Sequence, residues 1–309
     1  MIRVEGLVKQ YGRTQALRAL SFAVPQGSLF GFVGPNGAGK TTTLRILATL
    51  LEPSAGRAWV GDAEVTRDRA RVRELVGYMP DFFGVYEDLT VREYLDFYGR
   101  AYGIPAPRRG RVADDLLELM DLAAKRDEYV EGLSRGMKQR LGLARCLIHD
   151  PPVLLLDEPA SGLDPGARIE MREVLRELQR MGKTVIISSH ILPELAELCN
   201  VVGIVDHGQM VALGTVEEIV AQLGAQRRIE VRVLDRAEEA AALLRDQPEV
   251  RDLETEDRLV RVDFQGDDAA MHRVLRGLVE AGIPVTAFGA ISRGLEDIFL
   301  TITRNSNEG

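Results

Sequence analysis

The 309-residue chain contains little cysteine and few aromatic residues. Its two cysteines, Cys146 and Cys199, lie in apolar stretches without metal-ligand spacing, and Phe, Tyr and Trp make up 6% of the residues. Two such cysteines argue against a disulfide framework and a thiolate zinc site, and are typical of buried thiols in a reducing compartment. The chain opens directly into a strand pattern without a signal peptide, and no stretch approaches the roughly 18 apolar residues of a membrane span. We therefore expect a soluble protein that reaches any membrane through a partner.

Basic residues are also fewer than acidic ones. Lys and Arg number 39 against 47 Asp and Glu, which gives a net charge of −8. A surface that binds nucleic acid needs an excess of positive charge, so we expect no nucleic-acid partner. The length favours two domains over one.

A glycine-rich loop lies between two apolar segments near the amino terminus. Leu29–Val33 is a short apolar run typical of a buried parallel strand, Gly34–Thr41 matches G-x-x-x-x-G-K-T, and an apolar helical pattern continues from Thr42. In this strand–loop–helix context, glycines let successive backbone N–H groups face phosphate oxygens, and the helix N-terminus adds its positive dipole. The alternative, a glycine-rich turn with a chance lysine, does not account for the spacing.

The loop therefore predicts a nucleotide phosphate site. Lys40 would bring a positive charge to the outer phosphates, and the Thr41 hydroxyl would ligate Mg²⁺. The residues that we predict to bind the nucleotide here are Gly34, Pro35, Asn36, Gly37, Ala38, Gly39, Lys40, Thr41 and Thr42.

A carboxylate pair ends a second apolar run. Asp157 and Glu158 follow Val153–Leu156, where a central parallel strand meets solvent at the ligand-binding edge of an α/β sheet. A metal requires a hard oxygen ligand, and a second nearby carboxylate can accept a proton. The alternative is that both residues only cap the turn at Pro159.

Leu133–Arg140, with the sequence Leu-Ser-Arg-Gly-Met-Lys-Gln-Arg, is the most informative stretch in the chain. Together with the phosphate loop and the carboxylate pair, it resembles the ATP-binding cassette, the ATPase subunit of ABC transporters. The resemblance covers residues 1 to about 223 and implies ATP and Mg²⁺ as cofactors.

The resemblance also implies roles for single residues. Asp157 would hold Mg²⁺ through water, Glu158 would polarise the attacking water, and His190, at the end of the strand Thr184–Ser189, would touch the γ-phosphate. We therefore predict Lys40, Glu158 and His190 as catalytic residues. Tyr11 occupies the position of the aromatic residue that stacks on adenine.

Two further segments imply a dimer. Ser134 and Gly136 match the signature positions that contact the γ-phosphate held by a second subunit, and Ser161–Asp164 matches the D-loop that passes between subunits, so Asp164 is a predicted site residue. Arg135 replaces a usual glycine, which is tolerable if its side chain points away, and Met137 replaces a usual glutamine. The resemblance implies a head-to-tail homodimer that encloses two ATP molecules.

Asp81 is a second departure from the family pattern. It follows Pro80 where the family usually has a glutamine that meets Mg²⁺ and senses the membrane partner, so we predict Asp81 as a metal ligand. The alternative is that it only ends the strand and points to solvent. The aromatic segment Phe82–Tyr86 predicts a socket for a permease helix; the alternative is a local core beneath the helix Val91–Tyr102.

The order of patterns predicts the fold class. We expect an α/β protein with a P-loop NTPase core of ABC type, an antiparallel β subdomain, a helical subdomain at about 91–150, and a small α+β domain. The proposed boundaries are 1–223 for the nucleotide-binding domain and 225–309 for the accessory domain. The accessory domain has the strand and helix order βαββαβ, which is a ferredoxin-like signal, followed by an amphipathic helix at Leu295–Thr301.

This tail resembles those of drug- and glycoconjugate-exporter ATPases of the daunorubicin-resistance type. The resemblance implies that the chain hydrolyses ATP at the cytoplasmic face of the cell membrane and drives export through a separate transmembrane permease. The alternative is a soluble cassette ATPase that acts on ribosomes or DNA. Such proteins usually carry two cassettes or a long coiled-coil insert, and this chain shows one cassette and no heptads.

Overall fold

The computed structural model describes residues 1–291 except 83, 85, 87 and 224–226. Its contacts divide the chain into two compact units, Met1–Val216 and a second unit that begins at Glu217. The predicted amphipathic helix at Leu295–Thr301 lies outside the described residues.

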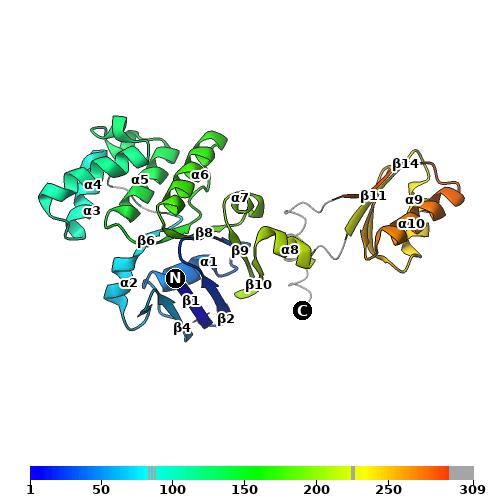
Figure 1. Cartoon of the computed structure of the whole chain (residues 1–309), viewed down its shortest axis with the longest axis horizontal. Helices are drawn as coiled ribbons and strands as arrows, with labels where there is room; N and C mark the ends of the chain where they lie inside the picture. The colour runs from blue at the N-terminus through cyan, green and yellow to red at the C-terminus, as the bar shows by residue number, and fades with distance from the viewer. Residues whose placement is uncertain (83, 85, 87, 224–226, 292–309) are drawn as a thin grey trace. The chain divides into compact units, whose positions relative to one another are not determined.

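A six-stranded sheet forms the centre of the first unit (Figure 1). Its order is β10-β9-β3-β8-β7-β6, in which only β10 runs antiparallel to its neighbour. The strands are β3 (Leu29–Val33), β6 (Val76–Met79), β7 (Val153–Asp157), β8 (Thr184–Ser189), β9 (Val201–Asp206) and β10 (Gln209–Gly214). Every residue of β3, β7 and β8 is buried, which explains why these strands read as continuous apolar runs.

An antiparallel sheet of four strands packs beside it. Its order is β2-β1-β4-β5, and its strands are β1 (Ile2–Tyr11), β2 (Thr14–Val24), β4 (Ala55–Val60) and β5 (Ala63–Glu64). Phe22 of β2 lies 5.5 Å from Phe30 and 5.4 Å from Phe32 of β3, measured between ring centroids. These aromatic contacts join the two sheets in one core.

Helices follow the strands of the central sheet. The helix α1 (Lys40–Leu47) begins directly after the glycine-rich loop and ends where Thr49 adopts a left-handed backbone conformation. A group of helices lies between β6 and β7 in the sequence (Figure 1). These are α3 (Val91–Ala101), α4 (Ala106–Leu119), η1 (Ala123–Lys125), η2 (Val130–Gly132) and α5 (Arg135–Leu147). The helix α2 (Arg69–Leu75) precedes β6, α6 (Pro165–Arg180) follows β7, and α7 (Leu192–Ala196) follows β8.

The second unit has the predicted βαββαβ order. Its antiparallel sheet is ordered β12-β13-β11-β14. Its elements are β11 (Arg227–Val233), α9 (Ala237–Arg245), β12 (Val250–Glu256), β13 (Leu259–Phe264), α10 (Asp268–Glu280) and β14 (Val285–Ile291), and α8 (Val216–Leu223) precedes them. Both helices pack on one face of the sheet, where Val231, Val262 and Leu244 are buried (Figure 1). The predicted fold class is confirmed in both units.

Candidate functional site

The glycine-rich loop connects the carboxyl end of β3 to α1. Gly39 is the N-cap of α1 with φ 103°, and a Cβ there would lie 2.6 Å from the Leu17 side chain and 2.8 Å from the Ala16 carbonyl oxygen. Only glycine fits this conformation and this space. The loop is also tied to the neighbouring strand, because the Gly34 N–H donates to the Ser189 carbonyl oxygen at 3.2 Å.

Lys40 is buried at the start of α1. Its Nζ donates to the carbonyl oxygens of Gly34 at 2.6 Å and Pro35 at 3.2 Å, and lies 3.7 Å from Glu158 Oε1. Burial lowers the pKa of the Lys40 amine, and the negative charge of Glu158 opposes this shift. The ammonium group is thus held at the sheet edge by acceptors that an anionic ligand can replace.

Asp157 is fixed by a neighbouring strand. It is buried, and its Oδ1 accepts a 2.6 Å hydrogen bond from Ser188 Oγ. Among the described residues, Asp157 Oδ2 is buried and finds no hydrogen-bond partner. A buried carboxylate oxygen is costly without a partner, so this atom fits a hard cation such as Mg²⁺.

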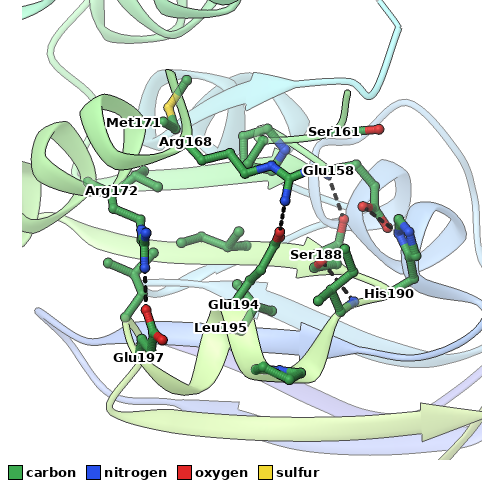
Figure 2. Close-up of a pocket in the computed structure, with 18 of the residues that line it drawn as sticks. Glu158, Ser161, Arg168, Met171, Arg172, Ser188, His190, Glu194, Leu195 and Glu197 are labelled. Atoms are coloured by element: carbon green, nitrogen blue, oxygen red, sulfur yellow. Dashed lines mark hydrogen bonds and ion pairs between the residues drawn. The ribbon is translucent and has the colours of Figure 1, made fainter. Parts of the chain in front are cut away.

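Glu158 has an unusual backbone and a polar surrounding. Its φ of 50° is left-handed, a conformation that non-glycine residues rarely adopt and that clusters at functional sites. Its N–H donates to the Ser188 carbonyl oxygen at 3.2 Å and to Ser188 Oγ at 3.0 Å. Its Oε2 lies 3.0 Å from His190 Nδ1 (Figure 2). Burial raises the pKa of the Glu158 carboxyl, whereas Lys40 and His190 oppose the rise.

A cavity of about 540 Å³ lies over the glycine-rich loop. Asp81 lines it together with Lys40, Thr41 and Glu158. The other predicted residues that line it are Pro35, Asn36, Gly37, Gly39 and Thr42. Tyr11 is not part of this lining; it is 46% exposed at the end of β1, with Lys9 Nζ 5.2 Å from its ring centroid.

Several lining residues were not predicted. Arg13, Arg18 and His207 also face the cavity over the loop. No motif marks these residues in the sequence, because the turn at His207–Gly208 meets β2 only in the folded chain, where the Arg18 N–H donates to the Gly208 carbonyl oxygen at 2.8 Å. Ser188, which bonds both Asp157 and Glu158, was also missed, because a serine within an apolar strand carries no motif.

The signature and D-loop residues lie apart from this cavity. Ser134 is the N-cap of α5 and accepts the Met137 N–H, and Asp164 is the N-cap of α6 and accepts the Ala167 N–H. Gly136 packs so closely on α6 that a Cβ there would lie 3.0 Å from the Ala167 Cβ. Within the described residues, Ser134, Gly136 and Asp164 do not line the cavity over the loop.

A second cavity of about 450 Å³ separates α6 from α7 (Figure 2). Glu158 and His190 line it together with apolar residues such as Met171 of α6 and Leu195 of α7. Arginines of α6 span its rim: Arg168 Nη1 donates to Glu194 at 2.8 Å, and Arg172 pairs with Glu197. These ion pairs connect the helix after the D-loop to the helix after His190.

Two aromatic residues of the segment after β6 are described, Phe82 and Tyr86. Phe82 is 94% exposed, and Tyr86 packs edge-on against Phe97 of α3, with ring centroids 5.2 Å apart. Residues 83 and 85 of this segment lie outside the described residues. Tyr86 is nevertheless 53% exposed and Phe97 is 44% exposed, so their contact is a pair of rings at the surface. The two interpretations of the segment, an aromatic socket and a local core, both stay predictions.

Comparison with known proteins covers both units. A family model described as ABC transporter matches residues 17–161, and one described as the C-terminal domain of DrrA1-3-like ATP-binding proteins matches residues 214–303. The daunorubicin resistance ATP-binding protein DrrA3 of Streptomyces coeruleorubidus is 37% identical over 302 residues, covering 98% of this chain and 95% of that protein.

Two more relatives match the first unit. The Nod factor export ATP-binding protein I of Ralstonia nicotianae is 42% identical over 220 residues, covering 71% of this chain and 68% of that protein. A solved ATP-binding subunit of an ABC transporter matches with a TM-score of 0.66 and 29% identity, covering 72% of this chain and 93% of that structure. No helix in the described part of the chain has the length and apolar character to span a bilayer.

Proposed function

The chain belongs to the ABC transporter family of ATP-binding subunits, and from that premise we propose that it couples ATP hydrolysis to export by a separate transmembrane permease. Membership of this family makes the chain a P-loop ATPase. The observation that supports a complete hydrolysis site is the position of Glu158, held between Lys40 and His190 at the edge where the phosphate loop begins. The export direction is supported by DrrA-like relatives and by the Nod factor export relative.

The loop and Lys40 bind the phosphates in this proposal. Lys40 exchanges its bonds to the Gly34 and Pro35 carbonyl oxygens for phosphate oxygens, which are stronger acceptors because they are charged. The backbone N–H groups of the loop and the N-terminus of α1 face the same anion. Binding is therefore built into the first unit alone.

Glu158 acts as the general base. Its raised pKa brings the carboxylate closer to the range in which it can take a proton from an attacking water. His190 keeps the carboxylate oriented through the 3.0 Å contact and reaches the γ-phosphate from the same edge. Ser188 holds the left-handed backbone of Glu158 in place.

Mg²⁺ supplies charge neutralisation at the phosphates when it is bound with ATP. Thr41 and Asp81, which line the cavity over the loop, and the buried Asp157 beside it would hold the ion. The free Oδ2 atom of Asp157 supports this assignment within the described residues.

A second copy of the chain completes the site. Ser134, Gly136 and Asp164 lie at the N-termini of α5 and α6 and do not line their own chain's phosphate cavity in the described structure. In a head-to-tail dimer these helix termini would face the partner's nucleotide, where their N–H groups favour an anion. Tyr11 remains the proposed contact for adenine.

The permease would dock near Asp81–Tyr86 at the cytoplasmic face of the membrane. The exposed Phe82 supports this position, because aromatic side chains are enriched in the buried cores of protein interfaces. The proposed domain boundaries, 1–223 and 225–309, place this surface in the nucleotide-binding domain.

Phosphate release from Mg-ATP by the purified chain tests the hydrolysis. We expect ATP-dependent turnover that rises more steeply than in proportion to ATP, and loss of turnover in Lys40→Ala. Co-purification with a polytopic membrane protein encoded beside it tests the transport role. Absence of hydrolysis in the unmodified chain, or association with ribosomes in place of a membrane protein, would overturn the proposal.

A further inference from the structure

Arg135 contacts the D-loop of its own chain. It is the first residue of α5, and its Nη2 donates a 3.0 Å hydrogen bond to the carbonyl oxygen of Ser161. A cation at a helix N-terminus is opposed by the helix dipole, so this position needs a compensating acceptor. The Ser161 carbonyl oxygen is that acceptor. The side chain that replaces the usual signature glycine thus has a defined partner.

Gly162 is shaped to accept the guanidinium group. Its φ is 66°, and a Cβ built there would lie 2.4 Å from both Cζ and Nη2 of Arg135. The two groups are therefore in direct contact, and any side chain at position 162 would displace the arginine. Arginine at 135 and glycine at 162 fit each other as a pair.

An independent contact joins the same two segments from the other side. Gly136 approaches Ala167 in the first turn of α6 closely enough that a Cβ would lie 3.0 Å from the Ala167 Cβ. Asp164 caps that same turn through the Ala167 N–H at 3.1 Å. The D-loop is thus held to the N-terminus of α5 at Ser161 and at the start of α6.

We propose that Arg135 is a positioning residue that fixes the D-loop to the signature helix, so that both segments approach the partner subunit as one body. This inference rests on the proposed function, because only a dimer brings these segments to a nucleotide. A loop that is ordered before association loses less conformational freedom when the dimer closes. The planar guanidinium is suited to this contact, since its pre-organised fork loses less conformational freedom for each hydrogen bond formed than a lysine ammonium does.

Hydrogen exchange in the nucleotide-free protein tests the contact itself. In Arg135→Gly, the amides of Ser161–Leu163 should exchange about 3- to 10-fold faster, as expected for the loss of one exposed hydrogen bond to a charged group. Arg69→Gly is the matched control, because Arg69 is also the first residue of a helix and contacts Glu52 and Thr66 instead. Unchanged exchange of the D-loop in Arg135→Gly would overturn the proposal.

ATP-driven dimerisation tests the consequence. In a Glu158→Gln background, Arg135→Gly should raise the ATP concentration for half-maximal dimer formation by about 3- to 10-fold, while nucleotide affinity of the monomer stays unchanged. In the active protein, the Hill coefficient for ATP should fall toward one. Equal dimerisation and equal Hill coefficients would show that the contact does not serve coupling.

Arg135→Lys separates positioning from charge. Lysine keeps the positive charge but lacks the planar fork, so we expect it to behave like Arg135→Gly. Wild-type behaviour of Arg135→Lys would assign the effect to charge alone and overturn the proposal. If the unmodified protein does not hydrolyse ATP, the proposed function is refuted, and with it the role of Arg135 in dimer formation. The hydrogen-exchange measurement on Arg135→Gly would still decide whether Arg135 holds the D-loop.

Discussion

Ser188 Oγ donates a 2.6 Å hydrogen bond to Asp157 Oδ1 across the β7–β8 strand pair. The same oxygen accepts the Glu158 N–H at 3.0 Å. One hydroxyl therefore positions both carboxylates of the proposed site, the metal-facing one through its side chain and the base through its backbone. This serine is fully buried, so no water can take its place without rearrangement.

Ser188→Ala should lower the ATPase kcat by about 10-fold, as expected for loss of a group that orients a metal ligand. It should also lower the free energy of unfolding by about 1 kcal/mol, because one buried hydrogen bond is lost. Ser189→Ala is the matched control, since Ser189 Oγ accepts the Ile191 N–H and contacts neither carboxylate in the described part of the chain. A steady-state assay of both variants decides the role: similar kcat values would contradict it.

Glu158→Gln should retain ATP binding and lose turnover by about 100-fold or more, because the amide cannot accept the proton of the attacking water. The variant should accumulate as an ATP-bound dimer, because ATP still closes the dimer but the hydrolysis that would open it again is lost. Size-exclusion chromatography with ATP and a phosphate-release assay measure both effects. Near-normal hydrolysis by the variant would contradict the assignment of Glu158 as the general base.

The pH dependence of the rate follows from the raised pKa of Glu158. The base must be ionised, so kcat/KM should fall as pH decreases through a pKa above the ordinary glutamate value. His190 opposes the rise, so His190→Gln should move the acidic limb to still higher pH as well as lowering the rate. Profiles between about pH 5 and pH 8 test this; an unmoved or lower midpoint in the variant would refute it.

The fold and the phosphate loop could be predicted because their signals are local. The apolar runs of β3, β7 and β8 and the glycine spacing of the loop each follow from backbone requirements within a few residues. Ser188 and Arg135 could not be assigned in this way. The role of Ser188 depends on the pairing of β7 with β8, and that of Arg135 on the packing of α5 against α6, and both contacts join residues more than 20 positions apart.

A chain that ends after Leu223 should still bind ATP. The phosphate-loop cavity is lined only by residues of the first unit in the described structure, and that unit has its own core. Thermal unfolding with and without Mg-ATP should show a similar shift in the truncated and full-length chains, because ligand binding to the native state stabilises it. A folded fragment without an ATP shift would contradict the proposed boundary.

Asp81 should make nucleotide binding unusually dependent on the metal. Its carboxylate lines the cavity with Lys40 and Thr41, where it would add a charged oxygen ligand for Mg²⁺ and repel the γ-phosphate when Mg²⁺ is absent. Asp81→Asn and Asp81→Gln both remove the charge, but only glutamine restores the reach of the family's usual side chain. We expect both variants to bind ATP more tightly without Mg²⁺ and to need more Mg²⁺ for half-maximal hydrolysis, with Asp81→Gln closer to wild type in maximal rate. Mg²⁺ titrations of the ATPase rate and measurements of ATP binding without metal give these quantities. Superimposable curves for the unmodified protein and both variants would show that Asp81 has no role in metal binding.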